Sequence, residues 1–542
     1  MNRFWPWTLI LVVGSLLFRL AIAALLPPGY DEAYYYLYPH HPDWSYFDHP
    51  LGVALTSAFG PALTGVATPL TLRLATLLIF CGTQLMLGLT ARRLFGDRAG
   101  VMTVALAALT PVLFAVFGIL DQPDGPLMLF WTAALWLLTE RCFGRATPRP
   151  GPWMLGFGVL LGLATLGKYY GLLLGGGVLG FCLTRPRFRP LLTSPWLLAA
   201  LVATVITSAP LWGWNLQHDW ISFRFQGGRV NTPESYDLLR VLALLGEHWG
   251  MLFPTISLPL AWVSAGNVIG LVRGRYRSDE ADRRALLLWV GLPIVVGFTL
   301  LGGKMRVLPS WPMPGYWSLL PLLGVAAADW GQRHRRGLIL WLGSTAVLVG
   351  GLGTLAVLHI RDGIAQIPGS RTLLPALTLE PTGGCNPPPR PWWQLLPVQC
   401  DTSVELFPPE RLTASARANP QFMAALQSSD FLFTNDYMLA GQYALGLDPI
   451  RRLPITTFSQ DPRGFAFWSR PEDWRGRSGL FLTTAKLQGS SLQEFAPLFR
   501  SLTYLTELPL RRNGEVVMRI RVYRAEKMVQ PYRWPYGLLP AP

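Results

Sequence analysis

The chain is short of charged residues and of cysteine for its length. Of its 542 residues only 14% are Asp, Glu, Lys or Arg, whereas 51% are hydrophobic. A soluble domain carries roughly a quarter charged residues, so this deficit argues against a soluble enzyme. The mean hydropathy of +0.32 argues equally against a disordered chain. Five cysteines without CxxC or zinc-finger spacing exclude a disulfide scaffold. The sequence therefore predicts an integral membrane protein.

The excess of positive charge does not indicate a nucleic-acid partner. The net charge is +15, but Lys and Arg lie in short clusters between apolar runs. Nucleic-acid binding needs basic residues gathered on one face or along one helix. The charge is better explained by membrane topology, and we expect no nucleic acid among the partners.

Apolar runs of about twenty residues are long enough to cross a bilayer as helices. The sequence contains eleven such candidates, so we expect a polytopic α-helical membrane protein with about eleven or more spans. The runs are residues 5–26, 72–91, 100–120, 125–140, 152–167, 169–184, 194–213, 246–271, 285–302, 310–329 and 337–359.

The connections between these runs alternate in charge. Eighteen arginines precede the first run or fall in every second connection: Arg3, Arg92, Arg93, Arg98, Arg141, Arg145, Arg149, Arg185, Arg187, Arg189, Arg273, Arg275, Arg277, Arg283, Arg284, Arg333, Arg335 and Arg336. Loops rich in Arg and Lys stay in the cytoplasm. The pattern predicts a plasma-membrane protein with a cytoplasmic N-terminus and, after an odd number of spans, an extracytoplasmic C-terminus.

The composition changes near residue 360. Residues 361–542 contain no further run that is long enough to span a bilayer, and we expect a small extracytoplasmic α/β domain after a transmembrane domain at 1–360. Residues 430–437 and 515–524 are predicted strands, the second because apolar and polar residues alternate in it. Cys385 and Cys400 can pair in an oxidising compartment, whereas Cys81, Cys142 and Cys182 fit small buried side chains.

The first outer loop, at residues 28–70, is acidic and aromatic, and its segment 29–50 contains no Lys or Arg. One interpretation is an aromatic belt at the membrane interface. Against it, Asp31 and Glu32 directly follow a span, where ionisable groups are costly and usually functional. A carboxylate beside aromatic rings has a raised proton affinity and can act as a general base.

Two further outer turns also carry charge. Asp121 and Asp124 lie in a Pro-Gly turn between two apolar runs, and a turn alone does not require two acids there. Lys168 stands alone between two runs; it either snorkels to the interface or meets a phosphate.

Outer cations recur further along the chain, as Arg224, Arg229, Lys304 and Arg306. Carboxylates together with isolated cations suit transfer of a group away from a phosphate. No P-loop is present, so the donor is expected to be a lipid phosphate. A multi-span transporter or lipid flippase with an outer domain is the alternative, although such folds often show internal repeats and none is visible here.

A zinc site built from His40, His41 and His49 is a third alternative. Structural zinc ligands usually come in spaced pairs, and adjacent histidines rarely face one ion. We therefore predict no metal-ligating residues. The sequence does not exclude a divalent metal as a cofactor.

Five motifs in order resemble a known family. They are Asp31-Glu32-Ala-Tyr-Tyr with Trp44-Ser-Tyr-Phe-Asp-His-Pro50, then Pro123-Asp-Gly-Pro-Leu127, Gly167-Lys-Tyr169, Trp214-Asn215 with Trp220-Ile-Ser-Phe-Arg-Phe-Gln226, and Pro309-x-Trp-Pro-x-Pro. Together they resemble bacterial family 39/83 glycosyltransferases of the C-type superfamily, which include protein O-mannosyltransferases and the lipid A aminoarabinose transferase. Segments 431–443 and 465–474 are similar to the C-terminal region of that family.

The resemblance implies a polyprenyl-phosphate-linked sugar donor, an inverting single displacement and an active site under the first outer loop. By matching motif, Asp31 occupies the position of the catalytic base, Glu32 lies beside it, and Asp124 is a second acidic residue of the site. Lys168 matches a position that faces the carrier phosphate, next to Tyr169.

The remaining substrate-binding candidates are Asp48, His49, Arg224, Lys304 and Arg306, the last two by location more than by motif. Ser310 stands where the Pro-Asn-Trp triplet has Asn. The segment Asp48-His49-Pro50 differs from the Glu-Lys-Pro of aminoarabinose transferases, so aminoarabinose is not the expected sugar. The acceptor is left open among lipid, polysaccharide and protein, and no cofactor is predicted.

Overall fold

The computed structural model describes residues 4–144, 148–228, 235–364 and 401–534. Two compact units divide the chain. The first comprises residues 1–21, 43–59 and 73–352, and the second comprises 22–42, 60–72 and 353–542. Residues 22–42, with Asp31 and Glu32, therefore pack with the C-terminal part of the chain, a division that differs from the sequence-based boundary near 360. Arg3, Arg145, Arg229, Cys385 and Cys400 lie outside the described residues.

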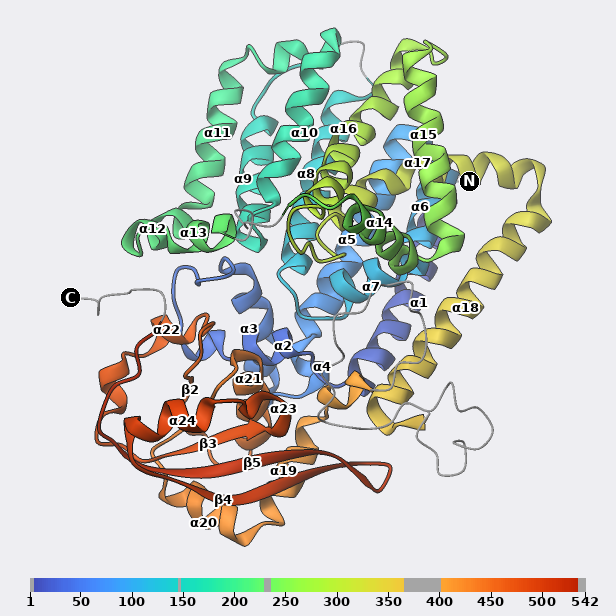
Figure 1. Ribbon diagram of the computed structural model, residues 1–542. Helices are drawn as coiled ribbons and strands as arrows, with labels where there is room; N and C mark the ends of the chain where they lie inside the picture. Colours follow the sequence, from blue (N-terminus) through green and yellow to red (C-terminus); the bar gives the residue numbers. More distant parts are fainter. Residues whose placement is uncertain (1–3, 145–147, 229–234, 365–400, 535–542) are drawn as a thin grey trace. The chain divides into compact units, whose positions relative to one another are not determined.

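Helices make up the first unit (Figure 1). Its helices, of which α1, α3 and α18 extend into the second unit, are α1 (Phe4–Leu25), α3 (Gly52–Thr64), α5 (Leu74–Phe95), α6 (Asp97–Leu109), α7 (Pro111–Gly118), α8 (Asp124–Cys142), α9 (Trp153–Gly167), α10 (Gly171–Thr184), α11 (Pro195–Thr207), α12 (Ala209–Gln217), α13 (Ile221–Gly228), α14 (Leu238–Leu252), α15 (Pro254–Val272), α16 (Ser278–Leu301), α17 (Met313–Arg333) and α18 (Arg335–Asp362). Every apolar run singled out above falls on one or two of these helices.

Length and composition qualify α1, α5, α15, α16 and α18 as membrane spans. Two bent pairs raise the number to seven in the described part of the chain: α6 with α7, bent by 79°, and α11 with α12, bent by 55°. A proline in the first turn of α7 and of α12 accounts for both breaks, because proline cannot continue the hydrogen bonding of a preceding helix. The number of eleven spans stays a prediction.

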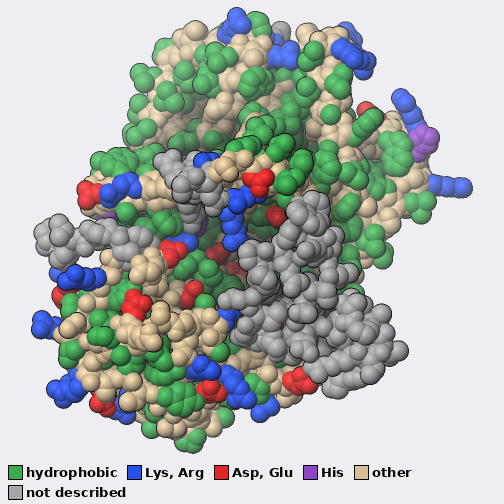
Figure 2. Space-filling view, in the orientation of Figure 1, with side chains coloured by type: hydrophobic (Ala, Val, Ile, Leu, Met, Phe, Trp, Pro, Cys, Tyr) green, Lys and Arg blue, Asp and Glu red, His purple; other side chains and the backbone are tan. Residues whose placement is uncertain are grey.

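The surface of these helices is apolar. Leu340 on α18 is 72% exposed and Trp262 on α15 is 82% exposed. Hydrophobic side chains cover much of the visible face of the helices, and Lys and Arg side chains gather at their upper ends in Figure 2. An exposed apolar surface of this extent is typical of contact with lipid.

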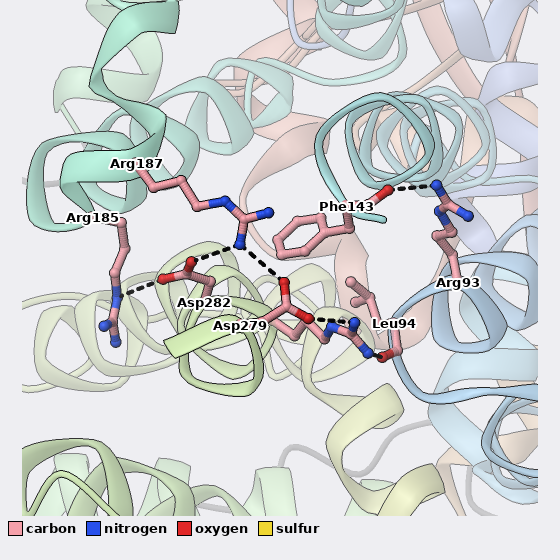
Figure 3. A network of polar contacts seen from close by, with 8 residues as sticks. Arg93, Leu94, Phe143, Arg185, Arg187, Asp279 and Asp282 are labelled. Carbon is pink, nitrogen blue, oxygen red and sulfur yellow. Dashed lines mark hydrogen bonds and ion pairs between the residues drawn. The ribbon is translucent and has the colours of Figure 1, made fainter. Parts of the chain in front are cut away.

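Arginines of the predicted cytoplasmic loops tie helix ends together (Figure 3). Arg187, in the short helix that follows α10, contacts Asp279 at 2.9 Å and Asp282 at 3.4 Å in the first turns of α16. Arg283 donates to the Leu94 carbonyl at 2.6 Å, which joins α16 to α5. These contacts give the basic connections a structural role in addition to the topological role that the sequence predicts.

The second unit contains a five-stranded sheet with the order β2-β1-β3-β5-β4. The strands are β1 (Phe431–Thr434), β2 (Ile455–Thr457), β3 (Gly479–Thr484), β4 (Phe499–Arg512) and β5 (Glu515–Met528). β1 pairs in parallel with β2 and β3, while β5 is antiparallel to β3 and β4. The helices of the unit are α2 (Tyr30–Tyr35), α4 (Pro69–Leu72), α19 (Pro409–Arg417), α20 (Pro420–Ser428), α21 (Tyr437–Leu447), α22 (Phe465–Trp468), α23 (Ala485–Gln488) and α24 (Ser491–Phe495).

Of the two predicted strands, 515–524 lies within β5 and is confirmed. The strand predicted at 430–437 is too long, because β1 ends at Thr434. Asp436 accepts hydrogen bonds from the backbone N–H groups of Met438 and Leu439 and thereby caps α21. The cap begins a helix where the sequence pattern alone suggested a continuing strand.

Candidate active site

Asp124 and Lys168 form a buried ion pair in the first unit. Lys168 Nζ lies 2.8 Å from Asp124 Oδ2, and the two side chains are only 8% and 4% exposed. Asp124 is the first residue of α8, and Lys168 directly follows α9. The negative charge thus lies at a helix N-terminus and the positive charge at a helix C-terminus, where the helix dipoles favour each of them.

Two glycines allow these helix ends to approach each other. A Cβ on Gly167 would lie 2.4 Å from the backbone N of Leu127 in α8. A Cβ on Gly52, at the start of α3, would lie 2.8 Å from the Leu166 carbonyl oxygen of α9. Real Cβ atoms do not approach so closely, so any larger residue at these positions must push the helices apart. The glycine before Lys168 is therefore what brings the ammonium to Asp124.

The pair leaves capacity for a further ligand. Asp124 Oδ1 is buried and has no hydrogen-bond partner among the described residues. The Lys168 ammonium lies 5.1 Å from the centroid of the Tyr170 ring, within the range of a cation–π contact. Because the ammonium is buried against Asp124, the structure disagrees with the alternative in which Lys168 snorkels towards solvent.

The tyrosines after Lys168 connect it to two other candidate segments. Tyr169 packs edge-on against Phe223 of α13 with ring centroids 5.3 Å apart. Tyr170 packs against Phe298 at 5.0 Å and Trp311 at 6.0 Å. The first contact joins Lys168 to the helix that carries Arg224, and the second joins it to the loop that carries Lys304 and Arg306.

Lys304 and Arg306 lie in the connection between α16 and α17. They alternate with Met305 and Val307, which are buried with Leu244 of α14 in a small hydrophobic cluster. Lys304 is half-buried and Arg306 is exposed. The backbone of the connection is fixed at Gly303, whose carbonyl accepts a hydrogen bond from the Asp237 N–H at 2.8 Å. Met305 and Val307 thus anchor the segment, and Lys304 and Arg306 occupy the positions between and before them.

Asp48 and His49 lie on a segment that packs against α13. Phe47 contacts Phe225 at 4.7 Å, and Gln226 Nε2 donates to the Asp48 carbonyl at 3.4 Å. Asp48 is 2% exposed and His49 is half-buried, whereas Arg224 is exposed on α13. The structure therefore places Asp48 and Tyr169 against the helix that carries Arg224.

Asp31 and Glu32 belong to the second unit, on α2. The Gly29 N–H donates to Glu32 Oε2 at 2.8 Å, so that Glu32 closes the N-terminus of this short helix, and Glu32 is 1% exposed. Asp31 is half-buried in the same turn. The capping contact accounts for the burial of Glu32. Asp31 and Glu32 therefore have different surroundings although they are adjacent in the chain.

The adjacent histidines of the first outer loop have different partners. His41 stacks on Trp468 with ring centroids 4.7 Å apart, while His40 packs edge-on against Tyr36 at 4.8 Å. Burial lowers the pKa of His41 to about 4. The rings of His40 and His41 thus pack against different aromatic partners and do not turn towards one common ion.

Two buried arginines were missed by the sequence analysis. Arg19 is fully buried in α1 and donates to the Leu77 and Gly118 carbonyls at 3.1 and 2.8 Å. Its guanidinium also lies 4.7 Å from the Phe80 ring centroid. Arg73, just before α5, is fully buried as well. The signal was present, because an arginine inside or beside an apolar run is costly and needs an internal partner.

Fold and site together define an integral membrane protein with a helical core, buried charges at helix ends and a separate sheet unit. The sequence model of the dolichyl-phosphate-mannose-protein mannosyltransferase family matches residues 48–214. A lipid A galacturonosyltransferase, RgtD of Rhizobium johnstonii, is 29% identical over 312 residues. That alignment covers 57% of this chain, which spans about 63% of the length of the relative.

Crystal structures of ArnT from Cupriavidus metallidurans share the fold. The apo structure superposes with a TM-score of 0.60, and the structure bound to undecaprenyl phosphate with 0.58. Each covers 96% of this chain and 98% of ArnT at 17% identity. These comparisons confirm the resemblance to the family 39/83 glycosyltransferases of the C-type superfamily. With the apolar helices, they support a protein of the bacterial inner membrane.

Proposed function

We propose that the protein is a membrane glycosyltransferase. It moves a sugar from a polyprenyl-phosphate-linked donor to a lipid, polysaccharide or protein acceptor on the extracytoplasmic face. The observation that carries this proposal is the buried Asp124–Lys168 pair, with an unpartnered carboxylate oxygen among the described residues and a neighbouring loop that bears two cations. A lipid phosphate is the anionic group that such cations suit.

In the proposed reaction the acceptor hydroxyl oxygen attacks the anomeric carbon, and the bond from that carbon to the phosphate oxygen breaks. The hydroxyl proton passes to the carboxylate of Asp31, and the polyprenyl phosphate leaves from the opposite face with inversion. Lys168, Lys304 and Arg306 stabilise the charge on the departing phosphate. Asp124 holds Lys168 in place, and Glu32 fixes the helix that carries Asp31.

Tyr169, Asp48, His49 and Arg224 are proposed to surround the sugar and the carrier. Their placement along one segment and one helix supports this role, since an aromatic ring and hydrogen-bonding groups together suit a sugar face. We further propose a cytoplasmic N-terminus, a transmembrane domain at 1–360 and an extracytoplasmic domain at 361–542, because the basic connections alternate with acidic and aromatic ones.

The test is transfer by the purified protein from undecaprenyl-phosphate-linked sugars to envelope lipids and glycans. Asp31→Asn keeps the size of the side chain and removes its basicity. We expect turnover to fall by a factor on the order of 10² or more, with binding of undecaprenyl phosphate unchanged. Asp43→Asn is the matched control, because an amide oxygen can still accept the hydrogen bond from Trp214 Nε1.

Two outcomes contradict the proposal. Normal turnover of Asp31→Asn together with an inactive Asp124→Asn moves the base to Asp124. Movement of the lipid-linked sugar across vesicles, without cleavage of its bond to phosphate, replaces the enzyme with a transporter or flippase.

A further inference from the structure

The helix α2, which carries Asp31, is attached to the C-terminal part of the chain by three tyrosine hydroxyls. Tyr30 donates to Glu405 Oε2 at 2.6 Å, and Tyr36 donates to Asp448 Oδ2 at 2.6 Å. The Tyr34 hydroxyl accepts from the Gly464 N–H at 2.9 Å. The three partners come from three separate segments of the second unit, so the hydrogen bonds fix both the position and the rotation of a helix of only six residues.

The acceptors are themselves held in place. Glu405 is paired with Lys486 at 2.6 Å, and Asp448 is paired with Arg452 at 3.1 Å. Hydrogen bonds to charged groups are roughly twice as strong as those between neutral partners. The attachment of α2 therefore does not depend on mobile side chains alone.

Helix α21 touches α2 through its backbone. A Cβ on Gly441 would lie 2.4 Å from the carbonyl carbon and oxygen of Ala33 and 2.5 Å from the Tyr34 nitrogen. Backbone atoms cannot give way as a flexible side chain can. Glycine is thus required at position 441 for the two helices to pack as they do.

An aromatic cluster completes the contact. Tyr34 is fully buried and packs against Tyr437 at 5.3 Å and Trp468 at 5.6 Å. Trp468 also stacks on His41, which follows α2 in the chain. Aromatic pairs stabilise beyond the area that they bury, so the segment around α2 is packed like the interior of a domain.

We propose that the C-terminal α/β domain positions the catalytic loop by holding α2 through Gly441 and the hydroxyls of Tyr30, Tyr34 and Tyr36. This inference rests on the proposed function, in which Asp31 is the base, and it gives the C-terminal domain a role in turnover. Gly441 and the tyrosines act as positioning residues, because they join α2 to the C-terminal part of the chain.

The experiment compares Gly441→Ala with Gly446→Ala in the full-length protein. Both positions lie on α21, but the three atoms nearest to a Cβ on Gly446 all belong to the Leu412 side chain, the closest at 2.8 Å, whereas those nearest to a Cβ on Gly441 are backbone atoms. Undecaprenyl-phosphate-linked sugar is the donor, and hydrogen–deuterium exchange reports on the amides of residues 33–37. We expect Gly441→Ala to speed this exchange and to lower kcat at least tenfold at unchanged donor KM, and Gly446→Ala to do neither.

A second background separates positioning from a general loss of structure. In a protein that already carries Asp31→Asn, Gly441→Ala should lower kcat by less than twofold more, because the group that it displaces is no longer a base. A full tenfold additional loss overturns the proposal, as does unchanged exchange in Gly441→Ala. Gly441→Ala in the background that retains Asp31 also overturns the proposal if it speeds the exchange and leaves kcat unchanged.

Should Gly441→Ala fail to fold, Tyr34→Phe and Tyr36→Phe carry the same test. Their control is Tyr443→Phe on α21, whose hydroxyl has no hydrogen-bond partner among the described residues. Failure of the proposed function is distinguishable from failure of this inference. If Asp31→Asn turns over normally the base assignment is wrong, while the exchange measurement still decides whether α21 holds α2.

Discussion

Replacing Lys168 tests whether its ammonium binds phosphate or only neutralises Asp124. At the observed 2.8 Å, two unit charges attract by about 6 kcal/mol at an effective dielectric constant near 20. Much of that attraction is offset by the desolvation of both groups. Removal of one partner alone leaves a buried uncompensated charge and costs about 3–5 kcal/mol. Lys168→Met and Asp124→Asn should therefore each lower the free energy of unfolding by about this amount.

The double variant Lys168→Met/Asp124→Asn removes both charges together and should recover most of the lost stability. Its fold is then intact, so the loss of transfer that remains reports on chemistry. We expect binding of undecaprenyl phosphate to weaken at least tenfold, and turnover to fall by a factor on the order of 10² when a group that stabilises developing charge is removed.

Three measurements check this prediction: thermal unfolding in detergent, binding of undecaprenyl phosphate, and the rate of sugar transfer. Asp97→Asn is the matched control for an ion pair. Asp97 contacts Arg92 at 2.7 Å, but the side chains of Arg92 and Asp97 are 30% and 41% exposed, so the pair should contribute about 0–1 kcal/mol. Transfer by the double variant within a few-fold of the wild-type rate would refute the reasoning, since Lys168 would then serve only to balance Asp124.

Three further predictions concern packing, pH and topology. Gly167→Ala should destabilise by about 1–3 kcal/mol and slow transfer, because its Cβ meets the Leu127 backbone, whereas Gly176→Ala, with open space around its Cβ, should do neither in the same assays. Because burial depresses the pKa of His41 to about 4, its stacking on Trp468 should be fully stabilising above about pH 6.5 and lose up to about 3 kcal/mol as the pH falls to 4; the protection factors of amides 33–41, which correct for the slower intrinsic exchange at low pH, should fall over that range in the wild type and not in His41→Phe. In a cysteine-free background, a cysteine at the exposed Ser428 should react with an impermeant reagent in intact spheroplasts and one at the exposed Ser278 should not, and the reverse pattern contradicts the proposed orientation.

Much of the helical unit could be predicted because length and apolarity suffice to define a membrane helix. The run at 72–91 became α5 (Leu74–Phe95), and the run at 337–359 became α18 (Arg335–Asp362). The run at 100–120 reads as one span in composition, yet it bends by 79° between α6 and α7. Pro111 marked the break, but the run stays apolar across it, so the bend is invisible to hydropathy.

The sheet unit was harder to predict because its strands do not alternate cleanly. All six residues of β3 are buried, so period-two alternation is absent from it. β4 is mostly part-exposed and irregular in register, with shifts near Tyr504 and Leu510. β5 shows the alternation that identifies a half-buried strand, and the predicted strand 515–524 covers its first ten residues.

The candidate site divides in the same way. Residue type and motif order pointed to Asp124 and Lys168 separately, since charges at the ends of apolar runs are conspicuous. Their pairing could not be predicted from the sequence. It depends on close contacts of Gly52 with α9 and of Gly167 with α8, and these elements are distant along the chain. The role of Glu32 in capping α2 is easier to predict from the sequence, because an acid three residues after a glycine N-cap is a recognisable local pattern.

The charges at the two ends of the helical unit are used differently, and this difference bears on function. At the basic end, Arg187 binds an acid of α16 and Arg283 donates to the Leu94 carbonyl at partly exposed positions, and these contacts join α16 to the segment after α10 and to α5. Asp124 and Lys168 are instead buried almost completely. A buried ion pair is weak evidence for stability, because well-packed apolar residues of similar volume often serve as well or better. Stability alone therefore does not account for the pair, whereas the proposed reaction does: Asp124 keeps the ammonium oriented in the unliganded protein, and an incoming lipid phosphate can share it.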